Sequence, residues 1–190
     1  GTPVLTVQQD YDAAAHTLRL TLQQSCPPTP NQPVKQPLHI PVKLGLLAAD
    51  GSPAMIHHNG EQHAEITLNL TEAEQSFVFE QLPAQPVVSL LRGFSAPVNL
   101  NMSRSLEELA FLFKHDSDSF NRWEAGQQLA TQVIFGLIED LQHQRPLHLN
   151  ALMVEAFHSL LANEADDLSY QALLLSLPDE NYLAGQMTVI

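Results

Sequence analysis

The sequence predicts a β-sandwich followed by an all-α segment. Eleven of the 13 prolines lie in residues 1–100, and proline interrupts helices and the inner strands of sheets. The same residues contain short runs in which apolar and polar side chains alternate, whereas from residue 105 onward the apolar side chains recur at helical spacing. We therefore expect a sandwich domain at residues 1–102 and a helical segment at residues 103–190.

Strands are predicted where every second residue is apolar. The clearest runs alternate at Leu18, Leu20 and Leu22 and again at Leu38, Ile40, Val42, Leu44 and Leu46. Further strands are expected around residues 4–9, 53–58, 64–70, 75–80, 86–92 and 97–102. Seven to nine short strands with no helix between them indicate two packed sheets of the immunoglobulin or fibronectin kind.

Turn signals separate these strands. They are Asp10-Tyr11-Asp12, Asp50-Gly51-Ser52 and Asn59-Gly60, the last of which suits a type I′ hairpin because both residues tolerate a positive φ. The longest irregular piece is the proline-rich run at residues 26–33. Its prolines predict an extended crossover between the two sheets.

Helix signals begin at Ser105, which forms a capping box with Glu108. A first helix is expected to reach about His115, and a second to run from about residues 116–118 to about Gln144. Shorter helices are expected at about 150–163, 166–176 and from Asp179. Antiparallel helices joined by short loops indicate the start of an α-solenoid or a helical bundle.

Two glycines inside the second helix, Gly126 and Gly136, are unfavourable there by roughly 1 kcal/mol each relative to alanine. A close approach of another helix would explain both.

Composition excludes several classes of protein. The chain has 8 basic and 21 acidic residues, a formal net charge of −13, so nucleic acids and anionic membrane surfaces are not expected partners. No apolar run has the roughly 20 residues that a transmembrane helix requires. The single cysteine, Cys26, has no partner for an internal disulfide and fits a cytoplasmic location.

Candidate chemical groups are few, and each also has a structural interpretation. His57, His58 and His63 form a local cluster that could hold a metal ion, although histidines on exposed hairpins are common. The run at residues 93–97 lacks the second glycine of a nucleophile elbow and favours a bend leading into a strand. Cys26 has no histidine near it in sequence to activate its thiol.

The carboxylate pairs Asp116/Asp118 and Asp166/Asp167 lie where helices are expected to begin. Capping explains them better than acid–base catalysis. We therefore assign no catalytic, cofactor-binding or metal-binding residue to the chain.

Several stretches, in order along the chain, resemble one family, the bacterial alanyl aminopeptidase or aminopeptidase N group of gluzincin zinc metallopeptidases. They are Gly1-Thr2-Pro3-Val4-Leu5, Pro27-Pro28-Thr29-Pro30, Lys35-Gln36-Pro37-Leu38-His39-Ile40-Pro41, Leu70-Thr71-Glu72-Ala73-Glu74-Gln75-Ser76-Phe77, Leu90-Leu91-Arg92-Gly93-Phe94-Ser95-Ala96-Pro97-Val98 and His115-Asp116-Ser117-Asp118-Ser119-Phe120-Asn121-Arg122-Trp123-Glu124-Ala125. The similarity covers nearly the whole chain and weakens after about residue 145.

The resemblance implies that the chain is a non-catalytic fragment of a larger enzyme that removes N-terminal amino acids from peptides with the help of zinc. In the family, a catalytic domain precedes a small β-sandwich, and a large helical domain follows it. The chain would supply the sandwich, which links the catalytic domain to the helical cap, and the first helices of that cap. The family's His-Glu-x-x-His and Gly-Ala-Met-Glu-Asn motifs do not occur in these 190 residues, so its functional residues cannot be transferred to them.

The resemblance also implies partners: the catalytic and helical domains of the parent chain, with peptides as the parent's substrate. The chain ends on the apolar run Met187-Thr188-Val189-Ile190, and we expect exposed apolar surface and self-association at a cut through the helical domain. A free-standing β-sandwich that binds a protein or a glycan through residues 26–37 and 57–63 is the alternative. An independent enzyme would require Asp116 and Asp118 to line one pocket.

Overall fold

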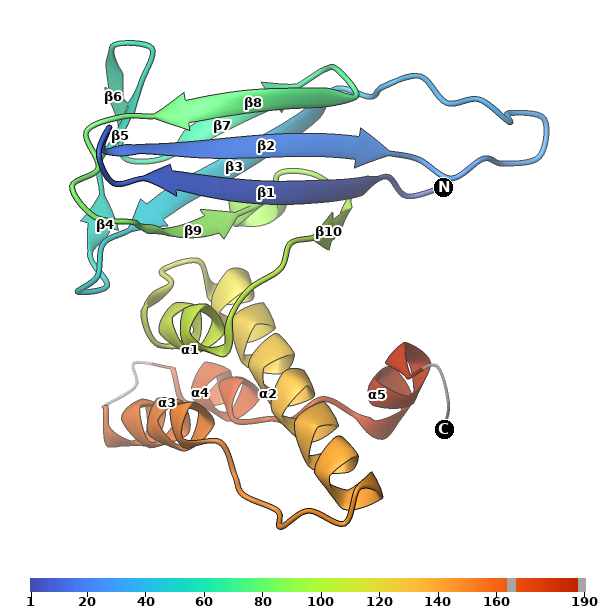
Figure 1. Ribbon diagram of the computed structural model, residues 1–190, viewed down its shortest axis with the longest axis vertical. Helices are drawn as coiled ribbons and strands as arrows, with labels where there is room; N and C mark the ends of the chain where they lie inside the picture. Colours follow the sequence, from blue (N-terminus) through green and yellow to red (C-terminus); the bar gives the residue numbers. More distant parts are fainter. Residues whose placement is uncertain (164–166, 188–190) are drawn as a thin grey trace. The chain divides into compact units, whose positions relative to one another are not determined.

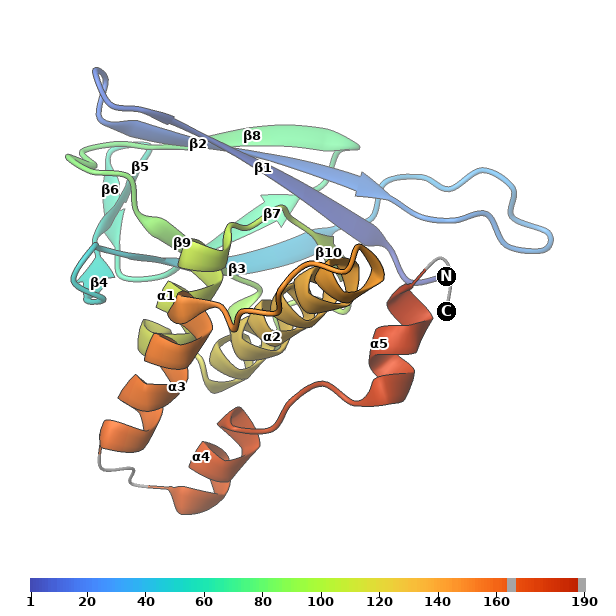
Figure 2. The same cartoon turned by 60° about the horizontal axis from the view of Figure 1, so that its bottom comes forward.

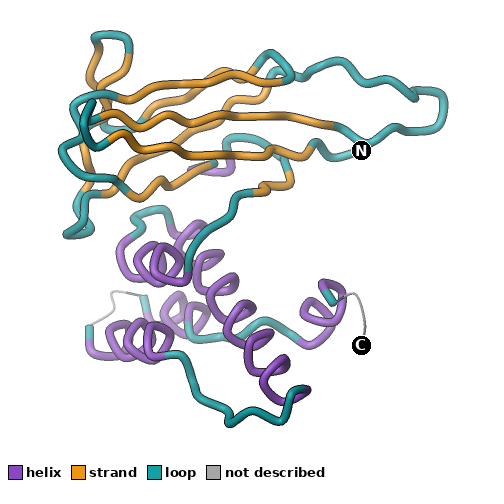
Figure 3. Tube along the Cα trace, in the orientation of Figure 1, coloured by secondary structure: helices purple, strands orange, loops and turns teal. Residues whose placement is uncertain are grey.

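The computed structural model describes residues 1–163 and 167–187 and divides the chain into two units, Gly1–Arg104 and Ser105–Ile190. The first unit consists of strands and the second of helices (Figures 1 and 3). The predicted order, a β-sandwich followed by an all-α segment, is confirmed.

Two sheets form the sandwich, and each contains four strands. The first has the spatial order β10 (Asn99–Asn101), β1 (Val4–Asp12), β2 (Thr17–Ser25) and β8 (Glu74–Phe79). In the second, β3 (Ile40–Leu47) pairs with β4 (Pro53–Ala54), β7 (Ile66–Leu70) and β9 (Val87–Leu90). All pairs are antiparallel except β1 with β10, so the last strand of the unit runs parallel to the first.

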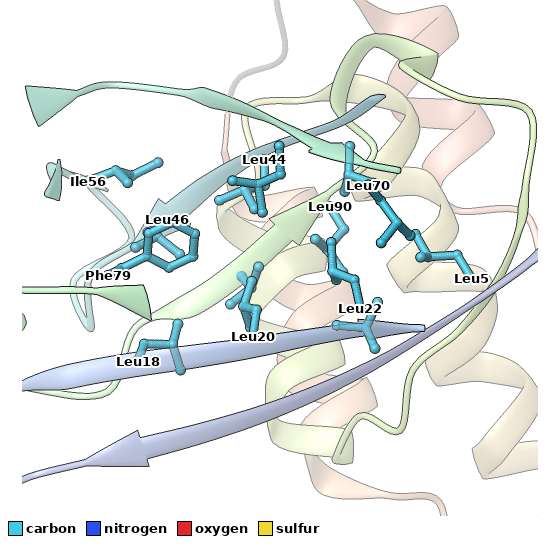
Figure 4. Close-up of a cluster of buried hydrophobic side chains, with 14 of the residues drawn as sticks. Leu5, Leu18, Leu20, Leu22, Leu44, Leu46, Ile56, Leu70, Phe79 and Leu90 are labelled. Atoms are coloured by element: carbon cyan, nitrogen blue, oxygen red, sulfur yellow. The ribbon is translucent and has the colours of Figure 1, made fainter. Parts of the chain in front are cut away.

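The core lies between the two sheets and consists mainly of leucines. Leu18, Leu20 and Leu22 of β2 lie on one side of their strand, as the alternation predicts, and are fully buried (Figure 4). The second sheet contributes Leu44, Leu46 and Leu70 to the same cluster. Burial of each such side chain contributes roughly 1.5–3 kcal/mol, so the cluster is a main source of the stability of the sandwich.

Two turn predictions have different outcomes. Asn59 and Gly60 have φ values of 51° and 80° between β5 (Ile56–His58) and β6 (Glu61–His63), as a type I′ turn requires. The turn predicted at residues 10–12 is wrong, because β1 continues to Asp12. The Oδ1 atom of Asp12 accepts hydrogen bonds from the N–H groups of Ala14 and Ala15, so the turn begins after the strand.

Two strand boundaries also differ from the prediction. The expected strand at residues 53–58 is two strands, since β4 pairs with β3 whereas β5 pairs with β6. The strand expected to start at Leu38 begins at Ile40, and Leu38 is 46% exposed rather than in the core. The backbone of Leu38 is bound by the side chain of Gln24 instead of by a neighbouring strand.

The helical unit contains α1 (Leu106–His115), α2 (Ser119–Gln142), α3 (Ala151–Ala162), α4 (Leu168–Leu174) and α5 (Glu180–Gln186). Helix α1 contacts α2 and α3, and α2 also contacts α3 and α4. Figure 2 shows these helices from a second direction. The predicted capping box is confirmed at its first half, because the Ser105 hydroxyl accepts a hydrogen bond from the N–H of Glu108 at 3.1 Å. Asp166 of the carboxylate pair and residues 188–190 lie outside the described residues.

Candidate functional site

A hollow of about 510 Å³ lies between the β5–β6 hairpin and the edge strand β8. Its lining residues are His58, Asn59, Gly60, Ser76, Phe77, Val78 and Glu80. The hairpin is joined to β8 by a hydrogen bond of 2.9 Å from the N–H of Glu80 to the carbonyl oxygen of His57. Because unpaired strand edges promote association, the hairpin partly protects this edge.

His58 is held by the protein at both ring nitrogens. Its Nδ1 lies 2.8 Å from the carbonyl oxygen of Val78, which can only accept, so Nδ1 carries the proton. Its Nε2 then accepts from the side-chain amide of Asn59 at 3.1 Å, and the ring packs edge-on against Phe79. Both ring nitrogens of His58 are therefore engaged in hydrogen bonds within the sandwich unit.

The three clustered histidines do not converge. His57 pairs with Gln62 and His58 with Glu61, and successive strand residues point to opposite faces. His57 therefore lies on the opposite face of the hairpin from His58 and His63. Over residues 1–163 and 167–187, no three His, Cys, Asp or Glu side chains are grouped so that they could hold a metal ion.

The run at residues 93–97 forms a short 3₁₀ turn, Arg92–Phe94, ahead of strand β10. Leu91, Gly93 and Phe94 have φ values of 56°, 61° and 54°, in the left-handed region that bulky side chains rarely adopt. The Ser95 hydroxyl accepts a hydrogen bond from the N–H of Lys43 at 3.0 Å. Ser95 thus ties this turn to β3, in agreement with a structural interpretation of the run.

Charged groups also hold this turn in place. The Arg92 guanidinium lies 2.8 Å from one carboxylate oxygen of Glu65, and Lys43 lies 2.8 Å from the other. Arg92 also passes so close to Gly45 that a Cβ there would lie 2.7 Å from the guanidinium. No local pattern in the sequence predicts this network, because its members are far apart in the chain.

The carboxylates at helix starts act as caps. Asp118 precedes α2 and accepts a hydrogen bond from the N–H of Asn121 at 3.0 Å, and Asp116 accepts one from the N–H of Asp118 at 2.9 Å. Asp167 caps α4 in the same way through the N–H groups of Ser169 and Tyr170. The contacts of Asp118 and Asp167 satisfy amides that a helix leaves without partners, as the sequence predicted. Asp116 instead ends α1 and binds the N–H of the residue that caps α2.

Tyr170 connects α4 to the start of α2. Its hydroxyl donates a hydrogen bond to the carbonyl oxygen of Ser119 at 2.7 Å. Desolvation raises the pKa of the Tyr170 phenol above its ordinary value, although the nearby Arg122 opposes the shift. The phenol therefore keeps its proton at neutral pH and acts as a hydrogen-bond donor.

The thiol of Cys26 donates to the carbonyl oxygen of Gly1 at 3.2 Å. This contact joins the N-terminus to the residue that follows β2, so Cys26 has a structural role here.

Gln24 is a buried polar residue that the sequence analysis did not single out. Its amide nitrogen donates to the carbonyl oxygens of Leu38 and Glu72 at 2.8 and 2.9 Å, and its amide oxygen accepts from the N–H of Leu38 at 2.8 Å. The alternation of apolar and polar residues in β2 could have indicated this buried position, because Gln24 is the next inward residue after Leu22. A polar side chain at an inward position predicts a hydrogen-bonded role.

Family comparisons divide the chain at nearly the same place as the structure. Residues 1–103 match the family described as "Domain of unknown function (DUF3458) Ig-like fold", and residues 106–190 match "Domain of unknown function (DUF3458_C) ARM repeats". In the part of the chain that the structure describes, no helix is both long and apolar enough to cross a membrane.

Similar curated proteins share one name. The chain is 38% identical to aminopeptidase N of Escherichia coli (strain K12) over 190 residues, which is 100% of this chain and 22% of that protein. It is 43% identical to aminopeptidase N of Caulobacter vibrioides over 188 residues, 97% of this chain and 20% of that protein. The chain thus spans about a fifth of the length of these relatives.

A solved structure agrees with these relatives. The crystal structure of Legionella pneumophila aminopeptidase A in complex with aspartic acid matches 98% of this chain and 20% of its own, at 26% identity and a TM-score of 0.76. The match includes both the strand unit and the helical unit.

Proposed function

Because the chain belongs to the DUF3458 family and is homologous to part of aminopeptidase N along its whole length, we propose that it is a non-catalytic module of a zinc aminopeptidase. The parent enzyme removes N-terminal amino acids from peptides. Its sandwich, proposed as residues 1–102, links the catalytic domain to the helical cap that begins at about residue 103.

The observation that carries this proposal is the joint match of both units to one relative. Sandwich and helices occur together, in the same order, within a fifth of aminopeptidase N. Both units of this chain match one part of a longer protein at 38% identity. A free-standing binding module does not require such a match. We place the catalytic groups of the parent enzyme in the part that corresponds to the other four-fifths of the relative.

The zinc ion is proposed to lie outside these residues. The described residues do not group three ligating side chains, and the histidine cluster is divided between two faces of a hairpin. The side chains at residues 1–163 and 167–187 therefore do not fit a zinc site, and we propose that its ligands belong to the catalytic domain of the parent chain. A cytoplasmic location is part of the same proposal, supported by the single free cysteine.

The test has two parts. The first is the gene sequence on either side of these 190 codons, which we expect to encode His-Glu-x-x-His and Gly-Ala-Met-Glu-Asn upstream. The second is hydrolysis of an alanyl chromogenic substrate by the full-length gene product and by the 190-residue chain, both with zinc supplied.

We expect turnover that a chelator abolishes in the full-length product and no turnover in the 190-residue chain. Turnover by the short chain that persists through repurification would contradict the proposal. A reading frame that contains only these residues would favour a free-standing sandwich that binds a protein or a glycan.

A further inference from the structure

We infer that the proline-rich segment between β2 and β3, residues 26–39, is a preformed docking arm that inserts into an apolar groove on another part of the parent aminopeptidase chain. This inference rests on the proposed function. The segment, named here the proline arm, extends well beyond the ends of the strands that carry it (Figures 1 and 2). Irregular segments of this length are uncommon in domains and are usually functional.

The base of the arm is clamped. Gln24, just before the arm, binds both the N–H and the carbonyl oxygen of Leu38 at its other end, and these bonds measure 2.8 Å. His39 adds a contact of 2.8 Å between its Nε2 and the Oδ1 of Asn69. The two ends of the arm are therefore fixed to the first and second sheets of the sandwich.

The tip of the arm is also ordered by its own contacts. Thr29 and Gln32 form an antiparallel bridge through two backbone hydrogen bonds of 3.2 and 2.9 Å. Between them, Pro30 and Asn31 form the turn, and Asn31 has a φ of 67°, as suits the third position of a type II turn. Lys35 folds back so that its ammonium group donates to Thr29 Oγ1 at 2.6 Å and to Gln32 Oε1 at 2.5 Å.

Apolar side chains make up more of the exposed surface of this arm than the polar side chains of Asn31, Gln32, Gln36 and His39. Val34 is 75% exposed, the largest value among the exposed large hydrophobic side chains of the described residues, and Leu38 is 46% exposed. Five prolines lie in the arm, and the only lysine or arginine, Lys35, uses its charge within the tip. Apolar surface without charge is typical of the buried centre of an interface, and a segment already rigid in its bound form loses little entropy on docking.

The occupant we assign is the remainder of the parent chain. Aminopeptidase N of Escherichia coli matches 100% of this chain, so the match spans the arm, yet about four-fifths of that relative lies outside the match. The chemistry of its surface requires a groove lined by apolar or aromatic side chains, the usual receptor for proline-rich segments.

The decisive experiment places a photo-crosslinking benzoylphenylalanine at position 34 of the full-length gene product. Mass spectrometry then identifies the residues joined to it. We expect intramolecular links to residues outside 1–190. Links only within the sandwich, or links between two copies, would overturn the inference.

A stability measurement provides an independent readout. We expect Val34→Asp to lower the melting temperature of the full-length product and to leave that of the 190-residue chain unchanged, because Val34 is exposed in the latter. The matched control is Met55→Asp, at an apolar residue of the same unit that is 48% exposed. Equal losses from both substitutions in the full-length product, or no loss from Val34→Asp, would overturn the inference.

The outcomes separate the two proposals. An active full-length aminopeptidase without crosslinks from position 34 would refute only the docking arm. A gene product with no further domain would refute both proposals, because neither a parent enzyme nor a groove for the arm would exist.

Discussion

Gly126 lies where α2 passes directly over a buried phenylalanine of α1. A Cβ at this position would lie 2.5 Å from Cδ2 of Phe113, whose ring is 1% exposed and stacks on Phe157 with centroids 5.4 Å apart. Close helix approach therefore explains Gly126, as the sequence suggested. The same explanation is wrong for Gly136, which is exposed and which no other described element approaches within 4 Å of a Cβ placed there.

These two glycines make a matched pair of substitutions. We expect Gly126→Ala to lower the free energy of unfolding of the helical unit by about 1–3 kcal/mol, because the packed ring cannot yield freely. Gly136→Ala is expected to raise it by about 1 kcal/mol through helix propensity. Urea unfolding followed by the fluorescence of Trp123, the single tryptophan and a residue of α2, measures both. Stabilisation by both substitutions would show that the contact at Gly126 is not tight.

The start of α1 depends on one side chain. Ser105 accepts the N–H of Glu108 at 3.1 Å, and Glu107 and Glu108 add negative charge to the first turn. We expect Ser105→Ala to lower the free energy of unfolding of the helical unit by about 1 kcal/mol and Ser105→Asp to retain it. The measurement is the same fluorescence-monitored unfolding.

Ser103→Ala is the control for this cap, since Ser103 is exposed and precedes the helix. We expect it to change stability little. An equal loss from Ser103→Ala and Ser105→Ala would indicate that the segment before α1 matters as a whole, rather than the cap.

Elements whose signals are local could be predicted from the sequence. Helix starts at Ser105 and Asp118 were predictable because a cap binds an amide only two or three residues away. The Asn59-Gly60 hairpin was predictable for the same reason. In contrast, the parallel pairing of β10 with β1 joins residues such as Leu100 and Leu5, and no local pattern reports a contact across the whole unit.

The candidate chemical groups show the same division. The capping roles of the carboxylates followed from their place before apolar helical runs. Whether His57 and His58 could share a ligand depended on the structure of the hairpin, which places them on opposite faces. The Arg92, Glu65 and Lys43 network could not be predicted, because three separate segments must fold before these charges meet.

Exposed apolar side chains are unusually numerous in the helical unit. Among the described residues, the large ones are Phe120, Leu141, Leu147, Leu149, Val154, Leu161, Leu168, Leu173, Leu177 and Tyr182, with exposures of 39–73%. Helix α5 buries none of its residues. Apolar surface of this kind commonly marks an interface, and the ARM-repeat description of residues 106–190 fits it, because such repeats bury their apolar faces against neighbouring repeats.

The apolar surface predicts association of the 190-residue chain with itself. A net charge of −13 opposes association by repulsion between copies, and salt screens that repulsion, so we expect the average mass to rise with both protein and salt concentration. Sedimentation velocity measures this. Leu161→Gln with Leu168→Gln should weaken the association, whereas Met55→Gln in the sandwich should not. A monomer at every concentration and salt level would mean that these side chains are too scattered to form a contact.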